Sequence, residues 1–364
     1  MNALRHVFCV VADCHAPSGH YRSLWQRHFY DGLRAVVDQL TIPENLDWTW
    51  ARRAGPEPVA DMVDERSRVS EHLAAQILRT HAAHGLDAVI SYCFAGDVQP
   101  EVVQRVIAAG VPWVNFFCDS TYRFEEVEAL ARVVSLNWFV EHAAIPRYRA
   151  LDVPFVCLPY ALTPAHLPDC ACERAQRDAA FIGMPTGPRV AQLGQLLAAG
   201  ARLEIRGPGW REEPTDNAAR QAMLFHGLGD HLRRQPSWPQ VQAHAKGPLR
   251  DEEVPEYLRG CRVLLGLNQG LDRHGRQLSY LKLRDLEFPG HGCCYLTEHN
   301  DDVTAALDAG TEVLTYRTLD EAADLLKNLA RDPGRTAEIG QAGRRRVLAE
   351  HTWATRIGQL AIAL

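Results

Sequence analysis

Short apolar segments alternate with amphipathic segments along the whole chain, and this alternation is the feature that most restricts its fold. Strand–helix–strand repeats favour a parallel sheet with helices on both of its faces. The sequence therefore predicts an α/β protein. The runs that we interpret as strands are 7–12, 88–92, 112–117 and 153–158 in the first half and 179–183, 202–206, 242–244, 262–267, 293–297 and 312–315 in the second.

The alternation falls into two series, and a chain of 364 residues is long for one hydrophobic core. The proline-rich piece that begins at Pro159 separates the two series. We therefore predict one Rossmann-like domain over residues 1–160, a linker over 161–177 and a second Rossmann-like domain over 178–345. The closing segment 346–364 is expected to be a helix that returns to the first domain.

Composition excludes several classes of protein. The net charge of -6 argues against a basic surface for nucleic acid, and 46% hydrophobic with 23% charged residues is typical of a soluble globular protein. We find neither a signal peptide nor an apolar run of transmembrane length. Ten cysteines without framework spacing indicate reduced thiols and a cytoplasmic location. Neither Cys170-Ala-Cys172 nor Cys293-Cys294 has the spacing of a zinc site, so we predict no metal.

The segment Leu278–Glu298 combines a helix with a following buried strand. Ser279 is a suitable N-cap, and residues 280–288 form a helical pattern that Pro289 is expected to end. The segment follows the apolar run 262–267, so the intervening loop leaves the carboxyl end of a strand. Open α/β sheets bind their ligands at that edge.

Three side chains of this predicted helix share one face, because Tyr280, Arg284 and Glu287 are spaced at i, i+4 and i+7. A helix start offers unpaired N–H groups to a diphosphate, and an ionised carboxylate such as that of Glu287 accepts hydrogen bonds from a ribose diol. The alternative is an ordinary surface helix with an Arg/Glu pair.

Several motifs in the second half carry a family resemblance. They are Phe181-Ile-Gly183, Ile205-Arg-Gly-Pro-Gly-Trp210, Arg284-x-x-Glu287 and the tail Gly343-Arg-Arg-Arg-Val-Leu-Ala-Glu-His-Thr-Trp353. In this order and spacing they resemble the CgeB-like branch of the GT-B glycosyltransferases. The resemblance covers mainly residues 178–357, and the first half is similar only in its general strand and helix plan.

The resemblance implies two Rossmann-like domains facing a cleft. A nucleotide-sugar donor would bind the second domain, the acceptor would approach from the first, and no cofactor would be needed. In this resemblance Glu287 is the ribose-binding carboxylate, Arg284 and Lys282 contact phosphate, and the amides of Ser279 and Tyr280 face the diphosphate.

Three further positions lie at predicted strand ends on the donor side. Gly183 and Gly207 are small enough to admit a nucleotide, although either glycine is also explained by a turn. Asn268 is a candidate for phosphate contact, or else a cap of its loop.

Ser279 marks a departure from the family pattern. Many retaining relatives have a second Glu at this place, eight residues before the ribose-binding Glu, so we predict inversion at the sugar. An inverting enzyme needs a general base at the acceptor hydroxyl. Asp119 follows the predicted strand 112–117 and is one candidate for that base, although it could instead cap the next helix.

The loop after the first strand supplies the other acceptor-side candidates. His15 and His20 could take a proton near neutral pH, or they could be packing or surface histidines. Asp13 lies at the start of this loop, and Gly19 would allow it to approach a ligand, unless Gly19 only completes a turn.

The sequence thus predicts a glycosyltransferase that moves a sugar from a nucleotide-diphosphate donor to a hydroxyl acceptor. The acceptor could be a glycan, a lipid-linked glycan, a protein, DNA or a small molecule. Two alternatives stay open: a nucleotide-sugar epimerase or hydrolase of the same fold, and a non-catalytic module that binds nucleotide sugar.

Overall fold

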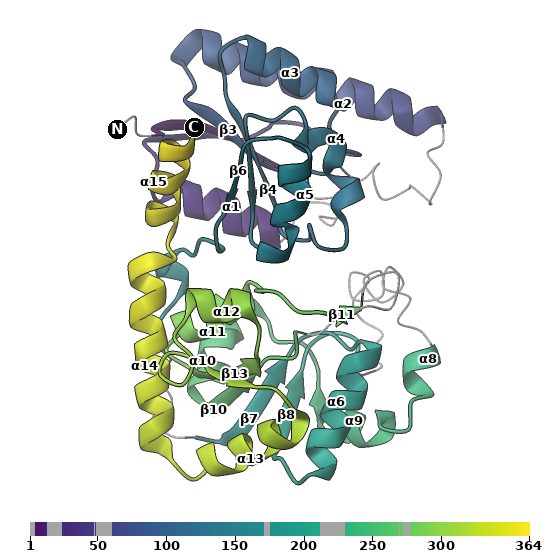
Figure 1. Cartoon of the computed structure of the whole chain (residues 1–364), viewed down its shortest axis with the longest axis vertical. Coiled ribbons are helices and arrows are strands. Elements are labelled where there is room, and N and C mark those ends of the chain that lie inside the picture. The colour runs from purple at the N-terminus through teal and green to yellow at the C-terminus, as the bar shows by residue number, and fades with distance from the viewer. Residues whose placement is uncertain are drawn as a thin grey trace. The chain divides into compact units, whose positions relative to one another are not determined.

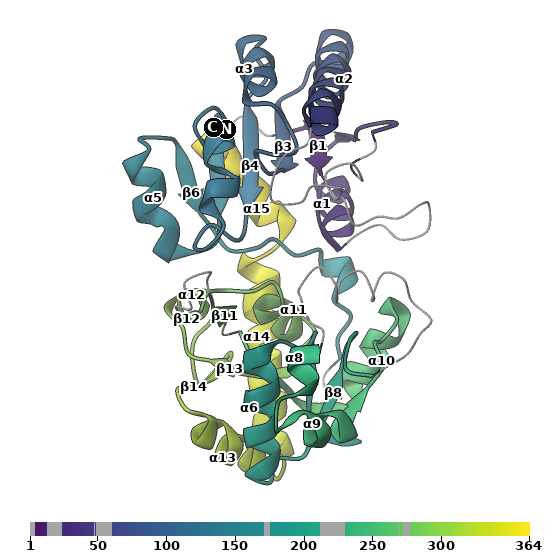
Figure 2. The same ribbon diagram turned by 90° about the vertical axis from the view of Figure 1, so that its right-hand side faces the viewer.

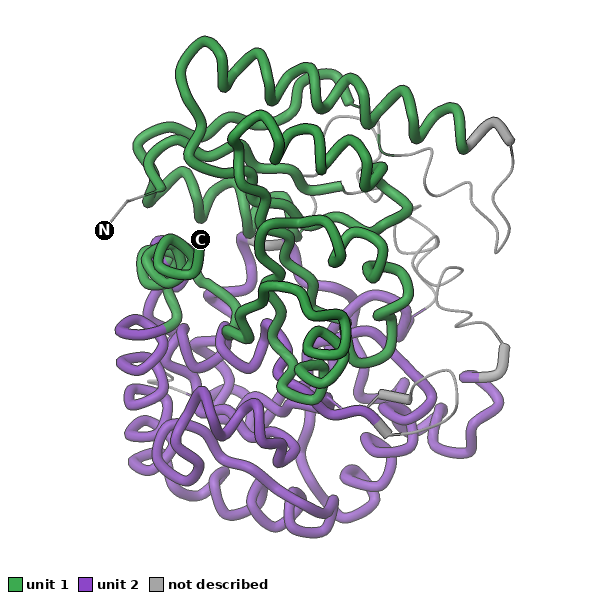
Figure 3. The backbone as a smooth tube through the Cα atoms, turned by 45° about the horizontal axis from the view of Figure 1, so that its top comes forward, with its two compact units in different colours: residues 1–163, 351–364 green, residues 164–350 purple. Residues whose placement is uncertain are grey.

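The computed structural model describes residues 4–12, 24–46, 48, 60–170, 175–211, 230–268, 270–271 and 277–364. The chain forms two compact units (Figure 1). Unit 1 contains residues 1–163 and 351–364, and unit 2 contains residues 164–350 (Figure 3). The predicted linker 161–177 is therefore divided between the units instead of standing apart from them.

Unit 1 contains a fully parallel sheet with the strand order β2-β1-β3-β4-β5-β6. Its strands are β1 (His6–Val11), β2 (Gln39–Thr41), β3 (Ala88–Tyr92), β4 (Trp113–Phe117), β5 (Leu136–Phe139) and β6 (Phe155–Cys157). The strand order reverses between β1 and β3, as it does in doubly wound α/β folds. The apolar strands are buried on both faces because helices cover both.

The helices of unit 1 separate into two layers. Against one face of the sheet, α2 and α3 bury Leu73, Ile77 and Val103 (Figure 2). The helices are α1 (Leu24–Arg34), α2 (Ala60–His84), α3 (Pro100–Ala108), α4 (Glu128–Ala131), α5 (Ile145–Ala150) and α15 (Trp353–Ala363), with one-turn 3₁₀ helices η2 (Phe124–Glu126) and η3 (His142–Ala144).

The last helix, α15, belongs to unit 1 although it ends the chain. Trp353 is 1% exposed, and its indole lies 5.2 Å from the Phe29 ring and 5.9 Å from the Trp138 ring, centroid to centroid. Gly32 in α1 faces the same indole, which would overlap any Cβ at that position. Leu162 and Thr352 form a parallel bridge at the point where the chain re-enters unit 1.

Unit 2 has a second fully parallel sheet with the order β14-β13-β10-β7-β8-β9. Its strands are β7 (Arg177–Ile182), β8 (Leu203–Arg206), β9 (Ala245–Lys246), β10 (Cys261–Leu265), β13 (Cys294–Glu298) and β14 (Leu314–Tyr316), and β11 (Gly270–Leu271) and β12 (Gln277–Leu278) form a separate antiparallel pair. Counted along the chain, this is the 3-2-1-4-5-6 order of the dinucleotide-binding fold, with its switch point between β7 and β10.

The core of unit 2 lies between the sheet and the helices α6, α9 and α13. On these helices the apolar residues recur at helical spacing, as Val190, Leu193 and Leu197 do in α6. The helices are α6 (Gly187–Ala198), α8 (Asp230–Arg233), α9 (Trp238–His244), α10 (Val254–Arg259), α11 (Arg284–Gly290), α12 (Asp301–Ala306), α13 (Leu319–Leu329) and α14 (Pro333–Glu350), with 3₁₀ turns η4 (Pro164–His166) and η5 (Asp251–Glu253). No helix in the described ranges is long and apolar enough to cross a membrane.

The predicted α/β class and the two parallel sheets are confirmed, but some elements differ. The predicted strand 242–244 is the end of helix α9, and the strand β9 follows it at Ala245–Lys246. The strands β2 and β5 were not predicted. We attribute the first miss to the shortness of β2 and the second to the polar Asn137 within β5, whose buried amide donates to the carbonyls of Ala131 and Pro154.

Candidate functional site

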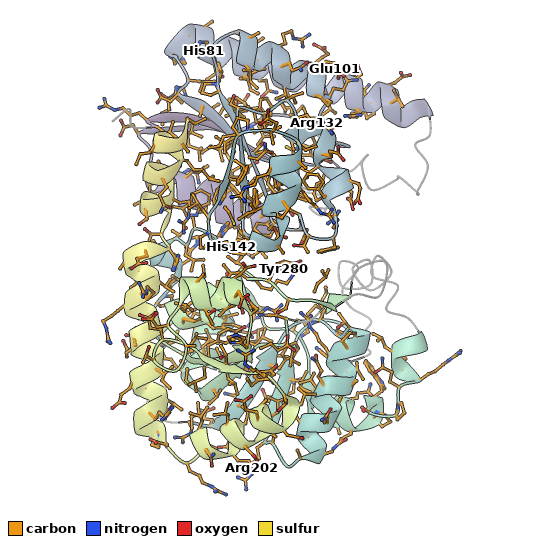
Figure 4. All side chains as sticks on the ribbon, viewed as in Figure 1. His81, Glu101, Arg132, His142, Arg202 and Tyr280 are labelled. Carbon is orange, nitrogen blue, oxygen red and sulfur yellow. The ribbon has the colours of Figure 1, made fainter. Side chains whose placement is uncertain are left out.

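The carboxyl ends of β7 and β10 meet at the switch point of unit 2, which is where open α/β sheets bind ligands. Tyr280, shortly after β12, and Arg202, directly before β8, lie at opposite ends of unit 2 (Figure 4). Because Arg202 marks the amino end of the sheet, the segment that contains Tyr280 lies at the carboxyl end.

Two arginines converge on the segment that follows β7. The Nη1 of Arg284 donates to the Ile182 carbonyl at 3.0 Å, and the Nη1 of Arg189 donates to the Met184 carbonyl at 2.9 Å. The Nε of Arg189 also donates to the Leu267 carbonyl at 3.2 Å, which ties α6 to the end of β10. Neither guanidinium forms an ion pair with a carboxylate of the described residues.

The charge on Arg189 is in an unfavourable position. Burial and, to a smaller extent, the positive charge of Arg284 lower the pKa of Arg189 to about 9, although the negative charge of Glu298 acts to raise it. Two cations close together without a carboxylate partner repel each other in a poorly solvated place. An anion bound between them would remove that cost.

Close backbone approach explains the two predicted glycines. Gly207 has φ +139°, and a Cβ there would overlap the Gly183 carbonyl. The indole Nε1 of Trp210 donates to the same carbonyl at 2.6 Å. The Gly-Pro-Gly-Trp motif therefore has a clear structural role, because it packs the end of β8 against the end of β7.

A buried polar network lies beside the arginines. Asp285 is 0% exposed, and its Oδ1 accepts from Tyr295 Oη and from Asn268 Nδ2, both at 2.6 Å. Its Oδ2 accepts from the Lys282 amide at 2.6 Å. Burial raises the pKa of Asp285, while these hydrogen bonds act to lower it. The network joins the loop after β10, the start of α11 and strand β13.

Asn268 has a defined orientation within this network. Its Nδ2 also lies 3.2 Å from Thr297 Oγ1, and its backbone amide donates to Glu298 Oε2 at 3.0 Å. The Oδ1 of Asn268 is buried, and the described part of the chain offers it no hydrogen-bond donor. The sequence left two roles open for Asn268, phosphate contact and capping of its loop. In the structure its side-chain amide hydrogen-bonds within this network.

The predicted start of the helix at Ser279 and Tyr280 is wrong. Helix α11 begins at Arg284 and has Leu283 at its N-cap, whereas Ser279 is exposed and precedes the helix. The Asp285 side chain accepts from the Lys282 amide, and the Asp285 amide donates to the Lys282 carbonyl at 2.9 Å, so a tight turn occupies this stretch. Tyr280 therefore does not share a helical face with Arg284.

One other detail of this segment, the end of the helix, differs from the prediction. Helix α11 continues through Pro289 to Gly290, and Gly292 has φ +79° just beyond it. The Nζ of Lys282, predicted to contact phosphate, lies 3.2 Å from the centroid of the Tyr280 ring. Glu287 is half-buried on α11, one turn after Arg284, so these two residues do share a face.

On the acceptor side the structure describes one predicted site residue. Asp119 follows β4, and its Oδ2 lies 3.6 Å from the Arg123 guanidinium. Asp13, His15, Gly19 and His20 lie outside the described residues. Within the described ranges no group of three or more His, Cys, Asp or Glu side chains is placed to hold a metal ion.

A second carboxylate of unit 1, which sequence reasoning missed, follows β5. Glu141 is 0% exposed, and its Oε1 accepts from the Thr121 amide at 3.5 Å. The next residue, His142, lies at the end of unit 1 opposite His81 (Figure 4). Glu141 therefore lies with Asp119 at the carboxyl edge of the sheet.

Sequence reasoning also missed Arg189, Gln192, Asp285, Tyr295 and Glu298 on the donor side. Of these residues, Arg189 could most readily have been predicted from the sequence. It lies in the first turn of the helix that follows β7 and is preceded by the capping residue Thr186. A basic residue at that place is a recognisable signal for an anion. The others were polar residues inside apolar patterns, which periodicity does not report.

Residues 189–361 match the family model described as glycosyl transferase-like. No curated protein matches the chain. The family match and the fold support a glycosyltransferase of the GT-B fold, while the CgeB-like subtype stays a prediction.

Solved structures share the fold over nearly the whole chain. Sucrose-phosphate synthase from Thermosynechococcus elongatus superimposes with a TM-score of 0.64 at 12% identity, covering 98% of both chains. HepE of Anabaena, solved with UDP and glucose, gives 0.62 at 12% identity, covering 99% of this chain and 98% of HepE. A glycosyltransferase from Rickettsia africae gives 0.59 at 10% identity, covering 100% of this chain and 98% of the other.

Proposed function

We propose that this GT-B glycosyltransferase moves a sugar from a nucleotide-diphosphate donor to a hydroxyl acceptor, with unit 2 holding the donor. The observation that carries the proposal is the convergence of Arg189 and Arg284 beside Gly183 at the switch point of the sheet. A diphosphate matches this arrangement, because guanidinium groups hydrogen-bond well to phosphate oxygens.

The start of α6 supports the same assignment. This helix follows β7 directly, and Thr186 caps it by accepting from the Arg189 amide at 3.4 Å. Its first-turn N–H groups and the positive end of its dipole favour an anion at this edge. In the transfer step, negative charge builds on the diphosphate leaving group, and fixed positive groups stabilise that charge. In this proposal the two arginines perform the task that a metal ion performs elsewhere.

UDP is the first nucleotide to test, because the similar HepE was solved with it. We expect UDP to raise the melting temperature of the protein in a thermal-shift panel of nucleoside diphosphates, since a ligand that binds only the folded state stabilises it. A preference for another base would identify a different nucleotide in the donor and would still agree with the proposal. The proposal fails if no nucleoside diphosphate shifts the melting temperature.

Glu287→Ala is expected to weaken nucleotide binding. If Glu287 accepts hydrogen bonds from the ribose diol, its loss costs about 1.5 to 3 kcal/mol, or roughly a ten- to hundredfold loss of affinity. Calorimetry with UDP measures the change. Glu338→Ala, at an exposed position of α14 in the same unit, is the matched control and should bind as the wild type does. Equal affinities for both variants would remove Glu287 from the ribose site.

For the chemical step we propose inversion with a general base from unit 1 and no metal ion. Asp119 and Glu141 are two carboxylates that follow strands of unit 1 at the carboxyl edge of its sheet. The Arg123 guanidinium lies 3.6 Å from Asp119, so the acceptor hydroxyl must compete with that ion pair. Turnover that persists in a metal chelator, together with a product of opposite anomeric configuration by NMR, is the expected result.

The same-fold alternatives differ in what happens without an acceptor. A nucleotide-sugar epimerase or hydrolase consumes its donor alone, whereas a transferase with no acceptor leaves the donor largely intact. We expect NMR of UDP-glucose mixed with the protein alone to show little change over many hours. Rapid epimerisation or complete hydrolysis would exclude the transferase. The cytoplasmic location stays a prediction.

A further inference from the structure

We propose that Gln192 is a positioning residue of the donor site. Its side-chain amide holds the Glu298 carboxylate, so that the Arg189 guanidinium remains available to the donor diphosphate instead of pairing with Glu298. This inference rests on the proposed function, since it assigns a role within the same site.

The first observation concerns Glu298, the last residue of β13. Its side chain is 3% exposed and lies at the carboxyl edge of the sheet. Its Oε1 accepts from Gln192 Nε2 at 2.8 Å, and its Oε2 accepts from the Asn268 amide at 3.0 Å. Both of these donors are neutral, so neither of them carries a charge that would neutralise the carboxylate.

The second observation concerns Arg189, three residues before Gln192 on α6. Residues at this spacing lie side by side on a helix, so Arg189 and Gln192 are neighbours on one face. The negative charge of Glu298 acts on Arg189, yet the Arg189 guanidinium donates to the carbonyls of Leu267 and Met184. No carboxylate in the described ranges forms an ion pair with it.

These contacts keep two opposite charges close together without direct contact. A buried cation and a nearby buried carboxylate would ordinarily lower their free energy by forming an ion pair. Gln192 is 8% exposed and occupies one Glu298 oxygen with an uncharged donor. Loss of this donor would remove one of the hydrogen bonds that hold the carboxylate in place, and an ion pair between Glu298 and Arg189 would then compete with the diphosphate for the same guanidinium.

The test is a set of variants whose effects on UDP affinity differ in sign. Gln192→Met keeps the length of the side chain and removes the donor, and we expect it to weaken UDP binding about tenfold, within the range of coupled neighbours. Glu298→Gln removes the competing charge and should bind UDP as tightly as the wild type or more tightly. The double variant should recover wild-type affinity, because no carboxylate remains to capture Arg189.

A purely structural role for Gln192 predicts the opposite outcome. In that case the double variant binds UDP no better than Gln192→Met, and the inference is overturned. Gln195→Met is the matched control on an exposed position of α6 and should leave affinity unchanged. Circular dichroism establishes that each variant is folded. If Gln192→Met does not fold, Glu298→Gln alone decides, since weaker UDP binding by this variant contradicts the inference.

The two proposals fail in different ways. If the wild type binds no nucleoside diphosphate, the proposed function is wrong and this inference is wrong with it. If the wild type binds UDP and the double variant shows no recovery, the inference alone is wrong and the donor site stands.

Discussion

Replacing Arg189 and Arg284 together by methionine is expected to abolish measurable UDP binding. Each charge-assisted contact between a guanidinium and a phosphate contributes about 1.5 to 3 kcal/mol, so the two together account for roughly two to four powers of ten in affinity. Each single variant should lose part of this affinity for UDP. Isothermal titration calorimetry with UDP measures all three variants.

The same double variant should be about as stable as the wild type, because removal of the poorly solvated charges offsets the loss of the hydrogen bonds to the Ile182, Met184 and Leu267 carbonyls. Burial and the neighbouring Arg284 both lower the pKa of Arg189, which means that the folded protein disfavours its charge. Methionine carries no charge into this place, and replacement of a poorly solvated charge by an apolar side chain is often neutral or stabilising. Lost binding with a preserved melting temperature would therefore separate a binding role from a structural one.

Arg345→Met is the control for this pair. Arg345 is exposed on α14 in the same unit, so its loss changes the net charge of the protein as much as either single variant does and should not affect UDP affinity. Wild-type affinity in the Arg189→Met/Arg284→Met variant would overturn the donor site itself.

Trp353→Ala is expected to destabilise unit 1 by about 3 to 5 kcal/mol, the usual cost of removing a large buried aromatic side chain. Trp353 packs against Phe29 and Trp138 and covers Gly32, so its removal leaves a cavity between α1, α15 and the sheet. Hydrogen exchange of peptides from unit 1 measures the change separately from unit 2.

Ile362→Ala provides the matched comparison on the same helix. Ile362 is 72% exposed, so its truncation should change the stability of unit 1 by less than about 0.5 kcal/mol. If the amides of unit 1 exchange at equal rates in the two variants, the packing of Trp353 does not contribute to the stability of this unit.

The strands that carry long apolar runs were predicted well from sequence. Residues 88–92 and the second-half runs that include Val263 and Leu296 became central strands, because strands buried on both faces need apolar residues at nearly every position. Residues 242–244 failed as a strand. The apolar Val241 directly precedes them, but it packs from the helix α9 against the core of unit 2.

At the donor site, sequence patterns did not predict the buried polar contacts or the start of helix α11. Asp285 lies among charged neighbours in the sequence but is fully buried, and the periodicity of the sequence does not reveal that Asn268 and Tyr295 hydrogen-bond to it. Its contact with the Lys282 amide moves the helix start to Arg284, which is why the cap at Ser279 was wrong. The contacts of Asp285 with Asn268, Lys282 and Tyr295 determine these details, whereas the position of the site at the switch point follows from strand order.

The bridge between Leu162 and Thr352 has a consequence for biosynthesis. Unit 2 is an insertion within unit 1, since residues 164–350 lie between the two parts of unit 1. The ribosome therefore makes all of unit 2 before it adds Trp353, and the place of that indole over Gly32 stays open until Trp353 has left the ribosome. Unit 1 is begun first and completed second, so a chain truncated after residue 350 would contain every residue of unit 2 and an incomplete unit 1.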